Sequence, residues 1–205
     1  MTIGPDPLVT LSSATMKTPP VLEQFVAACQ AAVASGSDVP QKVAGLLRSL
    51  VSEPTSLAAT VPAFTDDEIE TTPHGYRLGG EAVIHQAAEL TIMVLDTLPG
   101  VVQPAHDHAM IAFIGVFAGC EQQRFWTRTN NGVEVTTGRL LEAGEVIALG
   151  DRAIHAISSP EGQSARAVHV YLGDINNVER SVFEPETMAE YPMTSERYDE
   201  FCRPA

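Results

Sequence analysis

The sequence predicts a mainly β fold, an antiparallel double-sheet roll or barrel with a helical segment in front of it. Apolar residues recur every three or four positions between residue 20 and about residue 51, and this helical period is lost after about residue 70. From there, short β-branched segments follow one another, separated by Gly, Pro and Asn. Many short strands with turns between them favour antiparallel pairing over a parallel α/β sheet.

Two amphipathic helices are expected before the strands. Apolar residues keep the helical spacing over 21–33, and the run Gly36-Ser37-Asp38 ends this first helix. The same spacing continues over 43–51, where Glu53-Pro54 closes the second helix. Residues 1–19 are rich in Thr, Ser and Pro without a sustained period, so they are expected to form a flexible arm.

The strands are expected in the second half of the chain, and a turn signal at Asn130-Asn131-Gly132 predicts a hairpin between two of them. The candidate strands are 73–78, 89–96, 110–117, 121–129, 132–135, 145–149, 153–158 and 165–172. The length of 205 residues fits one domain. It divides into an arm (1–19), a helical preface (20–60), a β-barrel (61–175) and a C-terminal extension packed on the barrel (176–205).

Charge and composition limit the partners. Acidic residues outnumber basic residues by 26 to 12, and a net charge of -14 repels phosphate backbones and anionic lipids, so neither nucleic acid nor a membrane is expected. No apolar run approaches the roughly 18 to 20 residues of a membrane span, and the first residues lack the order of a signal peptide, so a cytoplasmic location is expected. Cys29, Cys120 and Cys202 are odd in number and widely spaced, and we expect buried thiols rather than disulfides.

Two histidines one residue apart, His106 and His108, stand just before an apolar segment. On a strand, side chains at i and i+2 project to the same face, so both rings could serve as ligands of one metal ion. A His-x-His pair by itself is more often a surface or hydrogen-bonded pair than a pair of metal ligands. His155, however, lies in a later apolar strand, where an unpaired imidazole would cost roughly 1–3 kcal/mol. Three imidazoles on two strands can share one metal.

The spacing of these histidines from nearby glycines resembles the two motifs of the cupin superfamily. The first motif consists of Gly100, then after five residues His106-Asp107-His108, and then Gly119. The second consists of Gly144 and, after ten residues, His155. Cupins usually have a glutamate four positions after the second histidine, where this sequence has Ala112. The resemblance implies a double-stranded β-helix, the cupin jelly-roll barrel, with the three histidines as metal ligands.

The missing glutamate is typical of the thiol dioxygenase branch of the cupins, exemplified by cysteine dioxygenase, which binds metal through three histidines. Members of that branch have an N-terminal helical preface, an arginine on an early strand that pairs with the substrate carboxylate, and a late Ser-x-His-x-Tyr run. By this resemblance Arg77 is the substrate-binding arginine, and His169 and Tyr171 are the catalytic pair. Ala167 replaces the serine, and the cysteine that crosslinks to the tyrosine in animal enzymes has no counterpart near Ala112.

The resemblance implies a mononuclear non-haem Fe(II) dioxygenase that oxidises a small carboxylate-bearing thiol, such as cysteine or 3-mercaptopropionate, to a sulfinate. A neutral three-histidine site leaves coordination positions for substrate and dioxygen, which suits Fe(II), with Mn, Ni or Zn as alternatives. Arg77 would hold the carboxylate, while Tyr171, oriented by His169, would donate a hydrogen bond to substrate or oxygen. The expected partners are therefore the thiol and dioxygen, and a monomer or homodimer is expected.

Two other functions remain open at this point. A three-histidine cupin can use its metal as a Lewis acid in an isomerase or lyase reaction. A cupin can also bind a metal or a small ligand without catalysis, and the fold by itself does not distinguish these cases.

Overall fold

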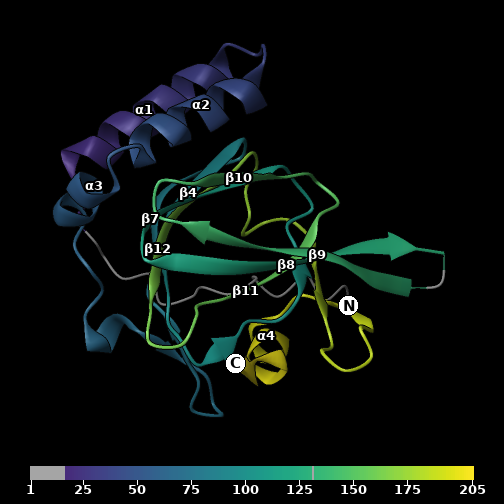
Figure 1. The fold of residues 1–205 in the computed structure, drawn as a ribbon. Coiled ribbons are helices and arrows are strands. Elements are labelled where there is room, and N and C mark those ends of the chain that lie inside the picture. Colours follow the sequence, from purple (N-terminus) through teal and green to yellow (C-terminus); the bar gives the residue numbers. More distant parts are fainter. Residues whose placement is uncertain (1–16, 131) are drawn as a thin grey trace, which may run out of the picture.

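The computed structural model of this chain describes residues 17–130 and 132–205. Three helices from the start of the chain lie together on one side of a β-barrel, and a short helix near the C-terminus lies on the opposite side (Figure 1). The predicted mainly β architecture with antiparallel sheets is confirmed. None of the helices in the described residues is both long and apolar enough to cross a membrane.

The helical preface contains three helices rather than two. α1 (Pro20–Ala34) and α2 (Val39–Val51) occupy the predicted positions, whereas α3 (Pro54–Thr60) was not predicted. Proline has no N–H to donate, which ends a helix, but it fits the first turn of the next one. Pro54 therefore closes α2 as expected and also begins α3.

The helices cover the outer face of one sheet. α1 contacts strands β3 (Glu81–Ala87) and β4 (Leu90–Thr97), and α2 and α3 contact β7 (Ala112–Ala118). At Gly115 of β7 an added Cβ would lie 2.9 Å from Cγ of Leu47, so only a glycine lets α2 approach this closely. Leu47 is completely buried in the apolar cluster between helices and sheet.

Two larger sheets and a two-stranded one form the barrel. The five-stranded sheet has the antiparallel order β10 (Val146–Leu149), β7, β12 (Ala165–Tyr171), β4 and β3. The other large sheet includes the central strands β6 (His106–Asp107), β11 (Ile154–Ser158), β5 (Val101–Val102) and β8 (Cys120–Thr129). β8 continues into a long hairpin with β9 (Gly132–Glu142). The small sheet pairs β1 (Glu70–Thr71) with β2 (Arg77–Gly79), after a 3₁₀ turn at Asp66–Glu68.

Two predicted strands differ by several residues from those observed, and the seven-residue strand β3 was not predicted. Residues 73–76 form a turn before β2, in which Gly75 has a φ of +85°. β9 extends beyond 135 to Glu142 because β8 pairs with it throughout. β3 was missed because Glu, Ala and Gln are weak strand formers, and its pairing with β4 overrides that preference.

The chain after residue 175 returns to the barrel. β13 (Ser181–Phe183) pairs with β6 through Val182 opposite His106, and β14 (Glu190–Pro192) pairs with β13. α4 (Ser195–Phe201) follows, and β15 (Arg203–Pro204) pairs with β5. The last segment therefore borders the strand that carries His106. Cys29, Cys120 and Cys202 are free and buried, as predicted.

Leu47→Ala is expected to lower the free energy of unfolding by about 2–5 kcal/mol, because it leaves a cavity between α2 and β7. Ser49→Ala, an exposed position on the same helix, serves as the control and should change stability by less than about 0.5 kcal/mol. Urea denaturation followed by circular dichroism measures both. Equal, small effects of the two substitutions would show that the helices do not stabilise the barrel.

Candidate metal centre

β6 and β11 bring the three predicted ligands together. His106 lies directly opposite His155 in the antiparallel ladder, and His108 follows β6 closely. One ring nitrogen from each of the three residues lies within 4.8 Å of the others, and all three residues are buried. Nε2 of His108 is 3.2 Å from Nε2 of His155. The structure therefore brings His155 next to His106 and His108, as predicted.

The donor set fits a single metal ion. Two imidazole nitrogens bound side by side at about 2.1 Å would lie roughly 3 Å apart, close to the observed separation. Nδ1 of His106 donates to the Pro104 carbonyl at 2.9 Å, and Nδ1 of His155 donates to Oε1 of Gln123 at 2.7 Å. Both bonds leave Nε2 as the nitrogen with a free lone pair, which is the form that a metal binds.

Burial keeps these imidazoles neutral. Desolvation lowers the pKa of His106 to about 4 and holds the pKa values of His108 and His155 well below their usual range. For His108 and His155 the neighbouring rings act in the same direction, because two protonated imidazoles at this separation would repel each other. The three ligands are therefore in their metal-binding form at neutral pH.

A buried chain of hydrogen bonds fixes the ring of His155. Nε2 of Gln123 donates to Oε1 of Glu121 at 2.6 Å, and the Thr97 hydroxyl donates to the other Glu121 oxygen at 2.9 Å. Glu121 and Gln123 are both completely buried on β8, and burial raises the pKa of Glu121 to about 7. The sequence prediction missed these two residues. The feature that could have revealed them is the presence of two polar side chains at alternating positions of one predicted strand.

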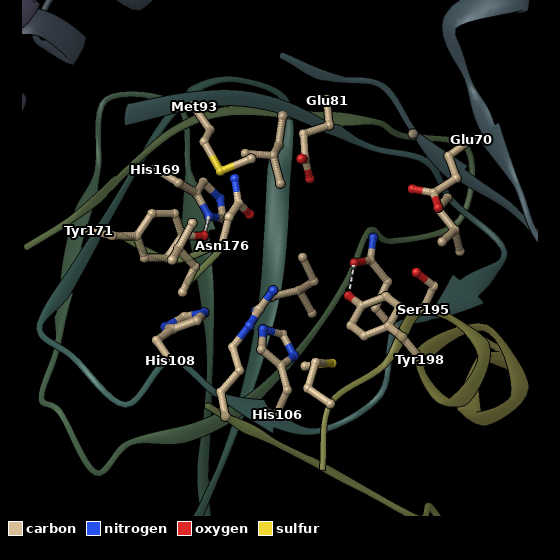
Figure 2. Close-up of a pocket in the computed structure, with 18 of the residues that line it drawn as sticks. Glu70, Glu81, Met93, His106, His108, His169, Tyr171, Asn176, Ser195 and Tyr198 are labelled. Carbon is tan, nitrogen blue, oxygen red and sulfur yellow. Dashed lines mark hydrogen bonds between the residues drawn. The ribbon is translucent and has the colours of Figure 1, made fainter. Parts of the chain in front are cut away.

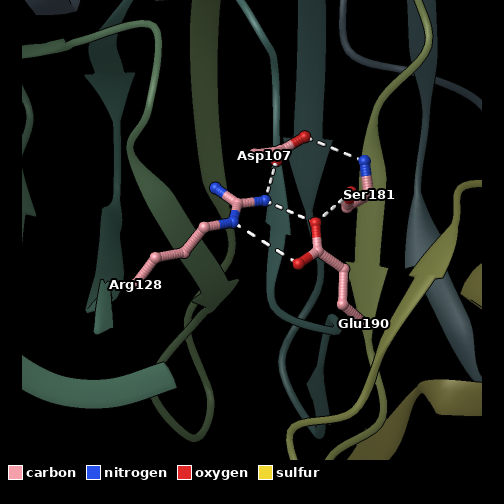
Figure 3. Close-up of polar contacts among 4 residues, drawn as sticks. All are labelled: Asp107, Arg128, Ser181 and Glu190. Atoms are coloured by element: carbon pink, nitrogen blue, oxygen red, sulfur yellow. Dashed lines mark hydrogen bonds and ion pairs between the residues drawn. The ribbon is translucent and has the colours of Figure 1, made fainter. Parts of the chain in front are cut away.

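Asp107 lies between His106 and His108 in the chain and enters a separate polar network (Figure 3). Its Oδ2 accepts from Nη2 of Arg128 at 2.6 Å, and its Oδ1 accepts from the backbone N–H of Ser181 at 2.8 Å. Arg128 also pairs with Glu190 at 2.7 Å. The ligand strand is thereby tied to β8 on one side and to the C-terminal strands β13 and β14 on the other.

The three ligands line a cavity of about 120 Å³. Figure 2 shows this cavity with His106 and His108 labelled. His169 and Tyr171 of β12 line it together with Met93 of β4, from the sheet that faces the ligands. Arg180, which follows β12, and Tyr198 of α4 complete the wall. The C-terminal segment thus contributes to the site, which the sequence prediction did not anticipate.

His169 and Tyr171 reach the cavity from β12, as the resemblance implied. Nδ1 of His169 lies 3.1 Å from the Tyr171 hydroxyl, and the Tyr171 ring centroid is 5.0 Å from that of His108. Burial lowers the pKa of His169 to about 3 and raises the pKa of Tyr171 above its usual value, so both are neutral. Within the described residues, Nε2 of His169 has no hydrogen-bond partner.

Arg77 does not line this cavity, and its predicted place in the site is corrected. It is the outward-facing first residue of β2, its side chain is 52% exposed, and it pairs with Asp66 at 2.6 Å on the surface. Arg180 is the arginine that lines the cavity. No motif marks Arg180 in the sequence, because it lies in an irregular segment whose path depends on the rest of the fold.

No family model matches the chain. Among solved structures, the DMSP lyase DddQ from Ruegeria pomeroyi DSS-3 is similar over 82% of this chain and 99% of its own, with a TM-score of 0.50 and 15% identity. A protein with a cupin-like fold from Ralstonia eutropha JMP134 matches 65% of this chain and 75% of its own, with a TM-score of 0.45 and 13% identity. The chain has the cupin fold.

An oxalate oxidase is a further structural neighbour, with 19% identity and a TM-score of 0.38. The match covers 44% of this chain and 44% of the oxidase chain, so less than half of that protein's length is represented. At these identities the similarity concerns the fold.

Gln123→Leu is expected to lower the affinity for Zn(II) or Ni(II) roughly ten- to a hundredfold, because it removes the acceptor that orients the His155 ring. Gln122→Leu, the neighbouring position whose side chain does not contact a ligand, is the matched control. Competitive titration against a chromophoric chelator measures both affinities, with His155→Ala as the reference for a disrupted site. Equal affinities of the two glutamine variants would contradict a role of Gln123 in orienting His155.

Metal affinity is expected to change by less than about threefold between pH 8 and pH 6. An exposed imidazole with a pKa of about 6.5 begins to take up a proton in this range. The pKa of His106, about 4, lies below it, as do the more strongly lowered pKa values of His108 and His155. The same titration, repeated at several pH values and corrected for the chelator's own protonation, tests this. A tenfold loss at pH 6 would show that protons compete for the ligands.

Proposed function

We propose that this cupin is a mononuclear non-haem iron dioxygenase that converts a small carboxylate-bearing thiol to its sulfinate. The main support is one observation: a buried three-imidazole donor set without a carboxylate faces a buried Tyr171–His169 pair across the same cavity. Ala112, at the usual glutamate position of cupins, is completely buried on β7 and offers no ligand atom.

The donor set favours an anionic substrate. Three neutral imidazoles do not compensate the charge of a divalent ion, so a thiolate is a favourable further ligand, and His106, His108 and His155 suit Fe(II) among other divalent ions. A bound Fe(II) would activate dioxygen and the thiolate, which is redox chemistry that side chains do not supply. Both oxygen atoms enter the product, since a thiol and dioxygen together give a sulfinic acid without another reductant.

Arg180 is proposed to bind the substrate carboxylate, in place of Arg77. A guanidinium can hold a carboxylate by two parallel charge-assisted hydrogen bonds, which fixes the direction of the rest of the molecule. In the described structure Arg180 makes no ion pair, and its buried Nε has no hydrogen-bond partner. Its guanidinium is therefore available for a ligand in the cavity.

Tyr171 is proposed to donate a hydrogen bond to the reacting end of the substrate. Its raised pKa keeps the hydroxyl protonated, and the 3.1 Å contact lets Nδ1–H of His169 donate to the phenol oxygen. In that tautomer the hydroxyl proton is free to point toward the substrate, and the His169 ring holds the phenol in place. Water is displaced when the substrate fills this small cavity.

Iron-loaded protein is expected to consume dioxygen and form a sulfinate when it is supplied with small carboxylate-bearing thiols. Arg180→Gln should raise KM at least tenfold, because a charge-assisted pair is lost. Arg77→Gln, which removes a surface arginine, is the matched control and should behave like the unmodified protein. An oxygen electrode and mass spectrometry of the products provide the measurement.

If none of the thiols tested raises the consumption of dioxygen above that of the metal-free control, the dioxygenase activity is excluded. Turnover of an acidic substrate without loss of dioxygen would instead assign the metal to the Lewis-acid class.

A further inference from the structure

The cavity contains carboxylates without partners, on the side away from the metal ligands. Glu81 of β3 and Glu70 of β1 both line it, and within the described residues neither makes a hydrogen bond or an ion pair. Figure 2 shows their oxygens pointing into the cavity from the side opposite His106 and His108 in this view. A desolvated charge without a partner is unfavourable, so such groups usually have a ligand or a counter-ion.

The same cavity also holds an unpaired cation. Arg180 lies close enough to influence Glu81 electrostatically, but the two form no ion pair within 4.0 Å. Burial and the charge of Glu70 raise the pKa of Glu81 to about 7, while Arg180 acts in the opposite direction. A positive and a negative group are thus held apart around one small space, an arrangement complementary to a ligand with both charges.

Unsatisfied buried nitrogens independently point to a polar ligand here. Nε2 of His169, a residue that is 3% exposed, has no partner within the described part of the chain, and neither does Nε of Arg180. Buried polar atoms in folded proteins are nearly always hydrogen-bonded. Both residues line the cavity with Glu70 and Glu81, so a ligand with several polar groups would satisfy all of them together.

We infer that the substrate carries a protonated amino group, recognised by Glu81 with the support of Glu70, while its carboxylate is bound by Arg180. This inference rests on the proposed function, which supplies the thiol and the carboxylate; the ammonium and its binding residues are added here. It selects an aminated thiol acid of the cysteine type over 3-mercaptopropionate. The protein, rather than the metal, then discriminates between the two substrates.

A second metal ion does not account for the two carboxylates. In the described residues, His106, His108 and His155 are the one group of three or more ligand residues close enough to hold an ion. Glu70 and Glu81 lie outside that group. An organic cation that needs only charge and hydrogen-bond acceptors fits them better.

The test compares L-cysteine with 3-mercaptopropionate, which differ only by the amino group. At pH 8, where the Glu81 carboxylate is ionised, kcat/KM for cysteine is expected to exceed that for 3-mercaptopropionate at least tenfold. Glu81→Gln should reduce this ratio at least tenfold, and Glu70→Gln should reduce it less. Glu89→Gln, an exposed carboxylate in the turn after β3, is the control and should leave the ratio unchanged.

Binding without turnover separates this inference from the proposed reaction. Anaerobic calorimetry on Zn(II)-loaded protein should give a dissociation constant at least tenfold lower for cysteine than for 3-mercaptopropionate, and near equality in Glu81→Gln. An unmodified protein that prefers 3-mercaptopropionate, or a preference for cysteine that persists in both glutamate variants, would overturn the inference. Absence of oxygen uptake with intact selectivity in binding would reject the dioxygenase and leave the ammonium site standing.

Discussion

The pairing of β6 with β11 is the contact on which the candidate site depends, because it places His106 opposite His155. β6 is only two residues long, so the ladder by itself holds it weakly. Its position is maintained from outside the cavity, where Asp107 bonds to Arg128 and Ser181 and where Val182 pairs with His106. The geometry of the ligands is thus a property of the four strands β6, β8, β11 and β13, the last of which belongs to the C-terminal segment.

Low polarity in the barrel has opposite effects on the two kinds of titratable group. It disfavours every charged form, so it lowers the pKa of the histidines and raises the pKa of Glu81 and Glu121. Neutral bases are consequently available on the metal side of the cavity, while the carboxyl groups of Glu70 and Glu81 lie opposite His106 and His108 in the view of Figure 2. The proposed metal site and the proposed ammonium site therefore share one cavity.

The N-terminal helices and the C-terminal segment of the described chain contribute differently to the cavity. None of the residues that line the cavity comes from α1, α2 or α3, which pack on the outer face of the five-stranded sheet around Gly115. The helices support the sheet from outside. The segment after β12 instead supplies Arg180 and Tyr198 to the wall, and Tyr198 donates a hydrogen bond to Gln103 at 2.6 Å beside the ligand strand.

Local sequence patterns determined the helical preface, most of the longer strands and the shared direction of His106 and His108, because side-chain alternation along a strand is a short-range rule. His169 and Tyr171 were assigned to the site by the resemblance to the thiol dioxygenases. The meeting of His155 with the His-x-His pair followed from motif spacing. Only the tertiary structure decided that Arg180 rather than Arg77 faces the cavity and that Glu81 lines it. It also decided that Gln123 and Glu121 lie behind the His155 ring. Which side of a segment is buried depends on the elements that pack against it, and those elements are distant in the sequence.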